Sequence, residues 1–283
     1  MIKESELILN QDGSLFHLHL LPGELATTIL LVGDPARCDM VASHFDSIRL
    51  KRENREIRTI TGTYNNKPIS VVSTGMGCDN IDIVLTEIDA LFNVDLEKRE
   101  PKSEHTELTI VRLGTSGAVN PELKIGDFAL SEMAVGIDGL AYFYGGSQEI
   151  RNLKKEQEYI SKAQPQPEMA QPYVVDGSKE LVERFCDVAK RCFTLSANGF
   201  YGPQGRSIRV PLARADYFES LERGDVDNIE MECAAIYLLS KLLKHNALTV
   251  CAIIAQRTKG EGNPNYSAII EKLVKTALDK LLK

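Results

Sequence analysis

The stretch "ELTIVRLGTSGAV", residues 107–119, is the part of this 283-residue chain that most directly indicates its fold class. Its first half is an apolar run of strand length, which predicts a buried β-strand that ends at Arg112. Small residues and hydroxyls follow at once. A positive charge at the end of a core strand needs a partner. That partner is either an oxoanion, which Arg112 and the Thr115 hydroxyl could bind together, or a core carboxylate.

Apolar runs of strand length recur on both sides of this stretch and alternate with helical patterns. The strand-like runs are "TILLVG", "PISVVSTG", "LTIVRLG", "DFALSE", "YVVDG", "FTLSANGF" and "TVCAIIA". The helical patterns are "DPARCDMVASHF", "NIDIVLTEIDALFNV", "SKELVERFCDVAKRC", "EMECAAIYLLSKLLKH" and "YSAIIEKLVKTALDKLL". The alternation predicts an α/β protein with a central sheet. We expect one domain, residues 1–283, in which the polar, proline-containing segment 150–172 is an excursion.

Composition narrows the class of protein. The chain is 43% hydrophobic and 26% charged, as in ordinary globular proteins, and its net charge of −7 argues against nucleic-acid binding. The start "MIKESELILN" has no signal-peptide pattern, and no apolar run approaches the roughly 20 residues that cross a bilayer. The six cysteines form no C-x-x-C pair and mostly lie in apolar stretches, which predicts buried free thiols in a reducing cytoplasm.

Two further strand ends carry small residues. In "LVGDPAR", residues 31–37, Gly33 ends a strand, Asp34 can cap the next helix and Pro35 suits its first turn. The exposed amides there, with Arg37 one turn on, suit an anion; a plain capped helix is the alternative. "STGMGCDN", residues 73–80, nearly matches the dinucleotide fingerprint, but Asn80 replaces the third glycine. Tight packing or a close backbone approach to another ligand is therefore favoured over a nicotinamide cofactor.

Two carboxylates flank Met231 in "NIEMECAA", residues 228–235, just before a strongly apolar helix. Glu230 and Glu232 could simply complement the dipole of that helix. The small apolar residues after Glu232, however, predict that its side chain is buried. A buried carboxylate needs hydrogen-bond donors, and vicinal sugar hydroxyls would supply them.

Two other motifs join polar side chains that suit a ligand. "FYGPQGR", residues 200–206, combines an aromatic ring, the Gln204 amide and the Arg206 guanidinium, which together match a planar heterocycle with neighbouring carbonyl and N–H groups. A surface loop is the alternative. In "FHLHL", His17 and His19 have strand spacing and would share one face, but no other cluster has metal-ligand spacing, so no metal site is expected.

Taken together, "FHL", "GDPAR", "STGMG", "RLGTSGAVNPELKIGD", "FYGPQGR" and "EMEC" occur in the order seen in the type I nucleoside phosphorylases. The resemblance extends from about residue 15 to the C-terminus. The glutamine–x–arginine pair resembles the pyrimidine-reading motif of the uridine phosphorylase branch. Where the purine branch has a serine–aspartate pair, this chain has Gln256 and Arg257. The resemblance implies a single domain with a central mixed sheet flanked by helices, which converts uridine and inorganic phosphate reversibly into uracil and ribose 1-phosphate without an organic cofactor.

The resemblance also implies roles for individual residues. Arg112, Gln204 and Arg206 would be catalytic. Phosphate would be held by Gly33, Arg37, Arg112 and Thr115, with Arg55 supplied by a neighbouring subunit. Ribose would contact Met231, Glu232 and the neighbour's His17, and uracil would contact Phe200, Gln204, Arg206 and, more distantly, Arg257. A homo-oligomer, either a dimer or a hexamer built from dimers, would therefore share its sites between subunits.

Some positions depart from the family pattern. Certain members hold potassium at the dimer interface with a glutamate and a serine; Glu56 is present here, but Asn80 replaces the serine. The 150–172 segment is an insertion without an assigned role. Three alternatives stay open: a phosphorylase of other base preference, purine or deoxypyrimidine; a hydrolytic nucleosidase of the same fold; and a non-catalytic nucleoside-binding protein. The arginines predicted to hold phosphate argue against the nucleosidase.

Overall fold

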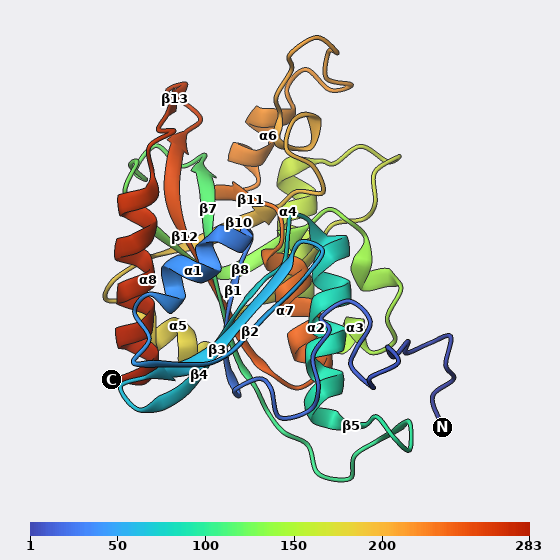
Figure 1. Ribbon diagram of the computed structural model, residues 1–283. Helices are drawn as coiled ribbons and strands as arrows, with labels where there is room; N and C mark the ends of the chain where they lie inside the picture. The colour runs from blue at the N-terminus through green and yellow to red at the C-terminus, as the bar shows by residue number, and fades with distance from the viewer.

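A computed structural model describes all residues, 1–283, and shows a large mixed sheet with helices on both faces (Figure 1). Eleven strands form this sheet, in the order β13-β12-β8-β10-β11-β7-β1-β4-β3-β2, with β9 paired to β8. The strands are β1 (Thr28–Val32), β2 (Ser47–Asn54), β3 (Ile57–Tyr64), β4 (Lys67–Ser73), β7 (Thr109–Ala118), β8 (Phe128–Gly136), β9 (Tyr173–Asp176), β10 (Lys190–Ser196), β11 (Asn228–Glu230), β12 (Asn246–Gln256) and β13 (Glu261–Gly262). A separate two-stranded sheet joins β5 (Val94–Asp95) to β6 (Glu100–Pro101).

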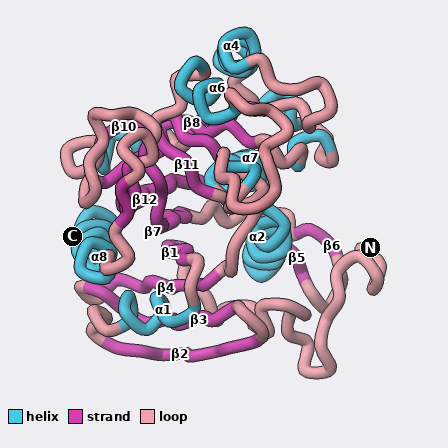
Figure 2. The backbone as a smooth tube through the Cα atoms, turned by 90° about the horizontal axis from the view of Figure 1, so that it is seen from above, coloured by secondary structure: helices cyan, strands magenta, loops and turns pink.

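Half of the sheet closes on itself. Strand β7 pairs with β12 in parallel and with β11 in antiparallel register, and β12, β8, β10 and β11 follow one another round to it. The other half stays open, because β1 and β4 continue from β7 in parallel and the β2–β3 hairpin adds antiparallel strands at the edge (Figure 2). The sheet is therefore mixed, as expected.

Helices cover both faces of the sheet. Successive side chains of a strand point to opposite faces, so an apolar strand has side chains to bury on each side. Leu31 of β1 packs in the cluster formed with α2 (Cys78–Asn93) and α7 (Cys233–Leu242). Leu30 packs in the cluster formed with α1 (Pro35–Ala42), α5 (Lys179–Phe185) and α8 (Ser267–Leu282). The remaining helices are α3 (Ser147–Ile150), α4 (Leu153–Ala163) and α6 (Tyr217–Arg223), with single 3₁₀ turns at Leu140–Tyr142 and Gly202–Gln204. The predicted α/β architecture is confirmed.

These two clusters contain most of the buried apolar side chains of the chain. No helix is both long and apolar enough to cross a membrane. Four of the six cysteines are buried, Cys38, Cys192, Cys233 and Cys251, and all six are free thiols.

The β2–β3 hairpin is the main element that the sequence analysis did not predict. Its first strand, "SIRLKREN", is largely exposed and carries charges at four of its eight positions, so it has no apolar run. The hairpin turns at Arg55, whose φ is 56°. One predicted boundary also shifts: α5 ends at Phe185, and "KRC" begins β10 instead of ending the helix.

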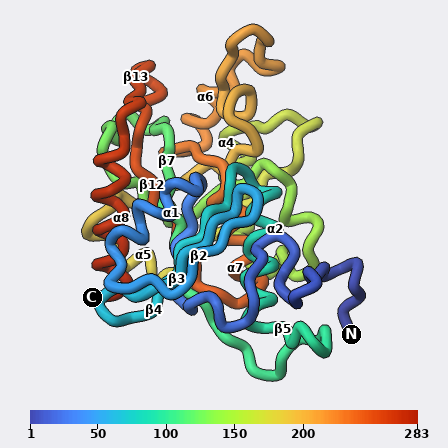
Figure 3. The backbone as a smooth tube through the Cα atoms, in the orientation of Figure 1, coloured from blue at the N-terminus to red at the C-terminus, as the bar shows by residue number.

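Two local predictions need correction or completion. His17 and His19 do not share a strand face, because "FHLHL" forms turns: His17 Nδ1 lies 2.6 Å from Glu87, while His19 has a φ of 54° and faces Asp12. The 150–172 excursion contains helix α4, which buries Tyr159 and packs against α6. It therefore lies against the same sheet and helices as the rest of the chain (Figure 3).

Candidate active site

Strand β7 continues well past Arg112, so the predicted strand end there is wrong. The strand runs from Thr109 to Ala118, because β12 offers pairing partners along its whole length, including Cys251 opposite Gly114. On the other side, β1 ends at Val32, one residue beyond the Leu31 that pairs with Arg112. Arg112 therefore lies in mid-strand, at the point where its neighbour β1 stops and the sheet opens.

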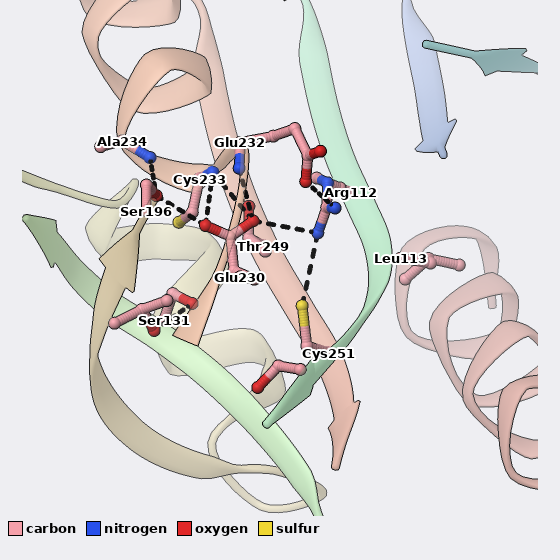
Figure 4. Close-up of polar contacts among 12 residues, drawn as sticks. Arg112, Leu113, Ser131, Ser196, Glu230, Glu232, Cys233, Ala234, Thr249 and Cys251 are labelled. Atoms are coloured by element: carbon pink, nitrogen blue, oxygen red, sulfur yellow. Dashed lines mark hydrogen bonds and ion pairs between the residues drawn. The ribbon is translucent and has the colours of Figure 1, made fainter. Parts of the chain in front are cut away.

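The Arg112 side chain is held between two carboxylates (Figure 4). Its Nη1 lies 3.2 Å from Glu230, and its Nη2 forms an ion pair with Glu232; all three residues are buried. The guanidinium folds back over Gly114, where an added Cβ would lie 2.8 Å from its Cζ. Arg112 thus has the core-carboxylate partners that formed one of the two alternatives, and it also lines a cavity.

The charges around Arg112 favour its ionised form. Burial alone would lower the pKa of the Arg112 guanidinium, but Glu232 and Glu230 outweigh burial and raise that pKa. Burial raises the pKa of the Glu232 carboxyl, and Arg112 opposes that shift. Glu232 also accepts a hydrogen bond from the Gly77 amide at 2.7 Å, so a loop from the other side of the cavity contacts the same carboxylate.

The cavity beside these residues has a volume of about 870 Å³ and gathers most of the predicted substrate-binding residues. From that set it is lined by Gly33, Arg37, Arg112, Thr115, Phe200, Gln204, Arg206, Met231 and Glu232. They come from four separate parts of the chain, which the sheet topology brings together beside β1, β7 and β11.

The turn after β1 forms one wall of the cavity. Asp34 caps α1 and accepts a hydrogen bond from the Ala36 amide at 2.9 Å, with Pro35 in the first turn, as predicted. Arg37 donates to the Leu113 carbonyl at 3.3 Å. Burial, and then the charge of Arg112, lower the pKa of Arg37. Two guanidinium groups thus line one cavity, and guanidinium groups are the donors that suit an oxoanion.

The loop around the Gly202–Gln204 turn forms another wall. Gln204 is buried, and its side-chain oxygen accepts a hydrogen bond from Arg206. Arg206 also donates to the Phe200 carbonyl at 2.7 Å, and its Cζ lies 4.1 Å from the centre of the Phe200 ring. Burial, followed by the charge of Arg257, lowers the pKa of Arg206. The amide and the guanidinium are thus held together as a hydrogen-bonded pair before any ligand binds.

Arg257 is the one base-side residue that does not line this cavity. It donates to the Gln204 carbonyl at 3.0 Å, and its guanidinium lies over the Phe218 ring. Arg257 thus supports the backbone of the loop that carries Gln204, and its more distant contact with a base stays a prediction.

His17 and Arg55 do not line the cavity of their own chain either. They lie together at its surface: the Asn54 amide donates to the His17 carbonyl at 2.9 Å, and the Arg55 guanidinium lies over the Phe16 ring. Both had been assigned to a neighbouring subunit's site, so their place outside this cavity agrees with that assignment without testing it.

Some lining residues were not identified from the sequence as candidates for this site. Ser116 and Tyr266 line the cavity. So do Glu230, whose sequence signal was interpreted only as a helix-dipole partner, and Glu56, which was named only for a potassium site. Ser116 sits within the "GTSGA" motif that drew attention to its neighbour Thr115. Tyr266 is the residue before helix α8, where the sequence pattern indicates the start of a helix and not a ligand site.

The residues that would make a cation site beside the cavity are only partly suited to one. No group of three or more His, Cys, Asp or Glu side chains could hold a metal ion. Glu56 lines the cavity and offers a carboxylate. Asn80, in contrast, uses its amide nitrogen as a donor to the Met76 carbonyl at 3.2 Å, and an N–H group cannot bind a cation.

Comparisons with known proteins show which family the chain is similar to. Residues 27–282 match the family model described as the phosphorylase superfamily. The chain is 30% identical to a uridine phosphorylase of Thermococcus kodakarensis, over 89% of this chain and 80% of that protein. It is 27% identical to a DeoD-type purine nucleoside phosphorylase of Streptococcus pneumoniae, over 84% of each. A crystal structure of a Trypanosoma brucei nucleoside phosphorylase, described as showing uridine phosphorylase activity, has a TM-score of 0.84 and 30% identity, and covers 98% of this chain and 99% of that one.

Proposed function

The chain belongs to the phosphorylase superfamily, and we propose that it is a uridine phosphorylase. It would convert uridine and inorganic phosphate reversibly into uracil and ribose 1-phosphate. The observation that carries this proposal is that two arginines, a buried carboxylate and the Gln204–Arg206 pair all face one cavity. Each group matches one part of the reacting pair: phosphate, ribose and pyrimidine.

Phosphate would bind where Arg37 and Arg112 converge, with the Thr115 hydroxyl and the backbone at Gly33 beside them. The glycosidic carbon acquires positive charge as its bond to the base breaks, and the phosphate dianion stabilises that charge and then attacks. Holding the anion at this position replaces a bimolecular encounter with an oriented one, which accounts for much of the rate in such reactions.

Glu232 would accept hydrogen bonds from the ribose hydroxyls, with Met231 against the sugar. Its carboxylate already has two fixed donors, Arg112 and the Gly77 amide, which hold it at the cavity wall. Because Glu232 contacts Arg112 directly, the sugar site and the phosphate site share one ion pair.

The leaving uracil carries negative charge on its carbonyl oxygens. Gln204 and Arg206 would hydrogen-bond that edge, and Phe200 would pack against the ring. The loop holds the guanidinium before the base arrives, so little reorganisation is needed when the charge develops. A preset donor of this kind contributes about 3 kcal/mol to the transition state.

We also propose a domain organisation, an oligomeric state and a cellular location for the enzyme. Residues 1–283 act as a single catalytic domain in a cytoplasmic homo-oligomer, a dimer or a hexamer of dimers, that serves nucleotide salvage. His17 and Arg55 complete a neighbouring subunit's site, which is supported by the fact that they lie together and that neither lines the cavity of its own chain. Phosphate is a co-substrate and no organic cofactor takes part. A potassium ion would have to use Glu56 with Asn80 in place of a hydroxyl.

A phosphate-dependence assay across uridine, 2′-deoxyuridine, thymidine and inosine tests the proposal. We expect base release from uridine only when phosphate is present. Release without phosphate would indicate a nucleosidase, faster turnover of inosine would indicate a purine enzyme, and binding without turnover would indicate a nucleoside-binding protein.

The base assignment has its own variant. Arg206→Ala should lower kcat/KM for uridine by at least a hundredfold, by the same ~3 kcal/mol, with little change in the KM for phosphate. Arg209→Ala is the matched control, because Arg209 is an exposed arginine of the same loop that does not line the cavity. Equal effects of the two substitutions would refute the role of Arg206.

A further inference from the structure

We propose that Glu230 is a positioning residue that holds the phosphate-binding arginine and the ribose-binding carboxylate in fixed relation, and that Ser196 acts through it. The inference rests on the proposed function for its substrates. No part of the functional assignment above uses Glu230 or Ser196, although both are buried within the same hydrogen-bonded cluster.

The Glu230 carboxylate contacts three elements at once (Figure 4). One oxygen accepts hydrogen bonds from the Ser196 hydroxyl at 2.6 Å and from the Cys233 amide at 2.9 Å. The other accepts from the Glu232 amide at 2.9 Å and lies 3.2 Å from Arg112 Nη1. A side chain that is only 3% exposed therefore joins β10, β7 and the start of α7.

Ser196 completes this arrangement from the end of β10. Its hydroxyl donates to Glu230 and accepts from the Ala234 amide at 2.8 Å. Ser196 and Glu230 are direct neighbours in parallel register, so the contact is fixed by the sheet itself. Ser196 does not line the cavity, and any effect that it has on substrate must pass through other residues.

The start of an α-helix has backbone amides without partners, and an acceptor must satisfy them. In α7 the Glu232 side chain makes no capping hydrogen bond, although Glu232 is the residue before the helix. Glu230 and Ser196 take the amides of Glu232, Cys233 and Ala234 instead. Glu232 is thereby free to direct its carboxylate to Arg112, to Gly77 and into the cavity.

The carboxylates of Glu230 and Glu232 therefore have different roles. Glu230 satisfies the helix and fixes one nitrogen of Arg112, while Glu232 fixes the other nitrogen and meets the sugar. If the Ser196 hydrogen bond is lost, the Glu230 carboxylate is freer to rotate. The Arg112 fork and the first turn of α7 then loosen together, so binding of phosphate and of nucleoside should weaken together.

Ser196→Ala tests the proposal, with Ser131→Ala as the matched control. Ser131 is also a fully buried strand serine with a 2.6 Å hydroxyl hydrogen bond, to Thr194, and it contacts neither Glu230 nor Arg112. Because the Ser196 hydroxyl donates to a charged carboxylate, its loss should disturb Glu230 strongly, and kcat/KM for uridine should fall at least tenfold in Ser196→Ala. The KM values for phosphate and for uridine should both rise, and Ser131→Ala should leave both within twofold.

A merely structural role predicts a different result. In that case Ser196→Ala would lower Tm, as Ser131→Ala would, without changing either KM, and this outcome would overturn the proposal. Should Ser196→Ala fail to fold, Ser196→Cys keeps the volume with a much weaker donor, and Glu230→Gln keeps the shape without the charge. Both must raise the two KM values, and unchanged values in either variant would also overturn it.

A binding measurement separates this inference from the proposed function. Inorganic phosphate should raise the Tm of the wild-type protein and of Ser131→Ala, and the increase should be smaller in Ser196→Ala. If wild type binds phosphate but does not cleave uridine, the proposed reaction is wrong while the positioning role stands. If the phosphate-induced increase is the same in Ser196→Ala as in wild type, the positioning role is wrong whatever the reaction.

Discussion

Replacing Gly114 by alanine should disable the cavity without straining the backbone of β7. Gly114 has no left-handed φ, and alanine is tolerated in a strand, so the main chain can keep its course. The added Cβ, however, would clash most severely with Arg112 Nη1, and it would lie 2.8 Å from Arg112 Cζ and 2.9 Å from Cys251 Sγ. Ordinary carbon contacts are about 3.5–4.0 Å. The Cys251 thiol can rotate away, but the guanidinium must move by about 1 Å.

A displacement of about 1 Å at a positioning group costs on the order of a hundredfold in rate. We therefore expect kcat/KM for uridine to fall about a hundredfold in Gly114→Ala, with a raised KM for phosphate and a circular dichroism spectrum like that of wild type. Steady-state kinetics with each substrate varied in turn measures both quantities.

A double-mutant cycle identifies the cause of the loss. In an Arg112→Ala background the guanidinium is absent, so Gly114→Ala should add little further loss. Full activity in Gly114→Ala would show that the reaction does not depend on the exact position of the Arg112 guanidinium. The same loss with and without Arg112 would show that the alanine acts through β7 itself, and either result would refute the reasoning.

Three further predictions concern the sugar, the oligomer and a buried acid. Glu232→Gln should reduce kcat/KM more for uridine than for 2′-deoxyuridine, which lacks one of the hydroxyls; equal losses would show that the carboxylate does not recognise the 2′-hydroxyl. Arg55→Ala and Arg112→Ala chains should each be nearly inactive, yet refolding them together should restore roughly a quarter of wild-type activity. With random pairing, half of the dimers contain one chain of each kind, and one of the two sites in such a dimer has both arginines. No recovery after verified chain exchange would place the site within one chain. Burial raises the pKa of Asp138, so the folded protein keeps that proton to higher pH than the unfolded chain, and ionisation costs stability as pH rises from about 4. Asp138→Asn should therefore raise Tm at pH 7 but not at pH 4, and a Tm that is lower at both pH values would contradict this.

Local patterns in the sequence determined the elements of the fold. The apolar runs that became β1, β4, β7 and β12 are buried on both faces, so periodicity and β-branched content identify them without any knowledge of their partners. The cap at Asp34 is equally local, because its hydrogen bond reaches an amide only two residues away. The exposed strand β2 lacks such a signal, because it is held by backbone pairing with β3 and its charged side chains do not indicate that pairing.

The chemical types of the candidate site were also present in the sequence, but their relations were not. The order of motifs indicated arginines for an anion, a carboxylate for hydroxyls and an amide–guanidinium pair for a base. Only the closed part of the sheet decided that Arg112 lies in mid-strand and meets Glu230 and Glu232, which are more than a hundred residues away in the chain. Because those contacts depend on strand register and on the space above Gly114, no local pattern could specify which carboxylate caps the helix and which one faces the substrate.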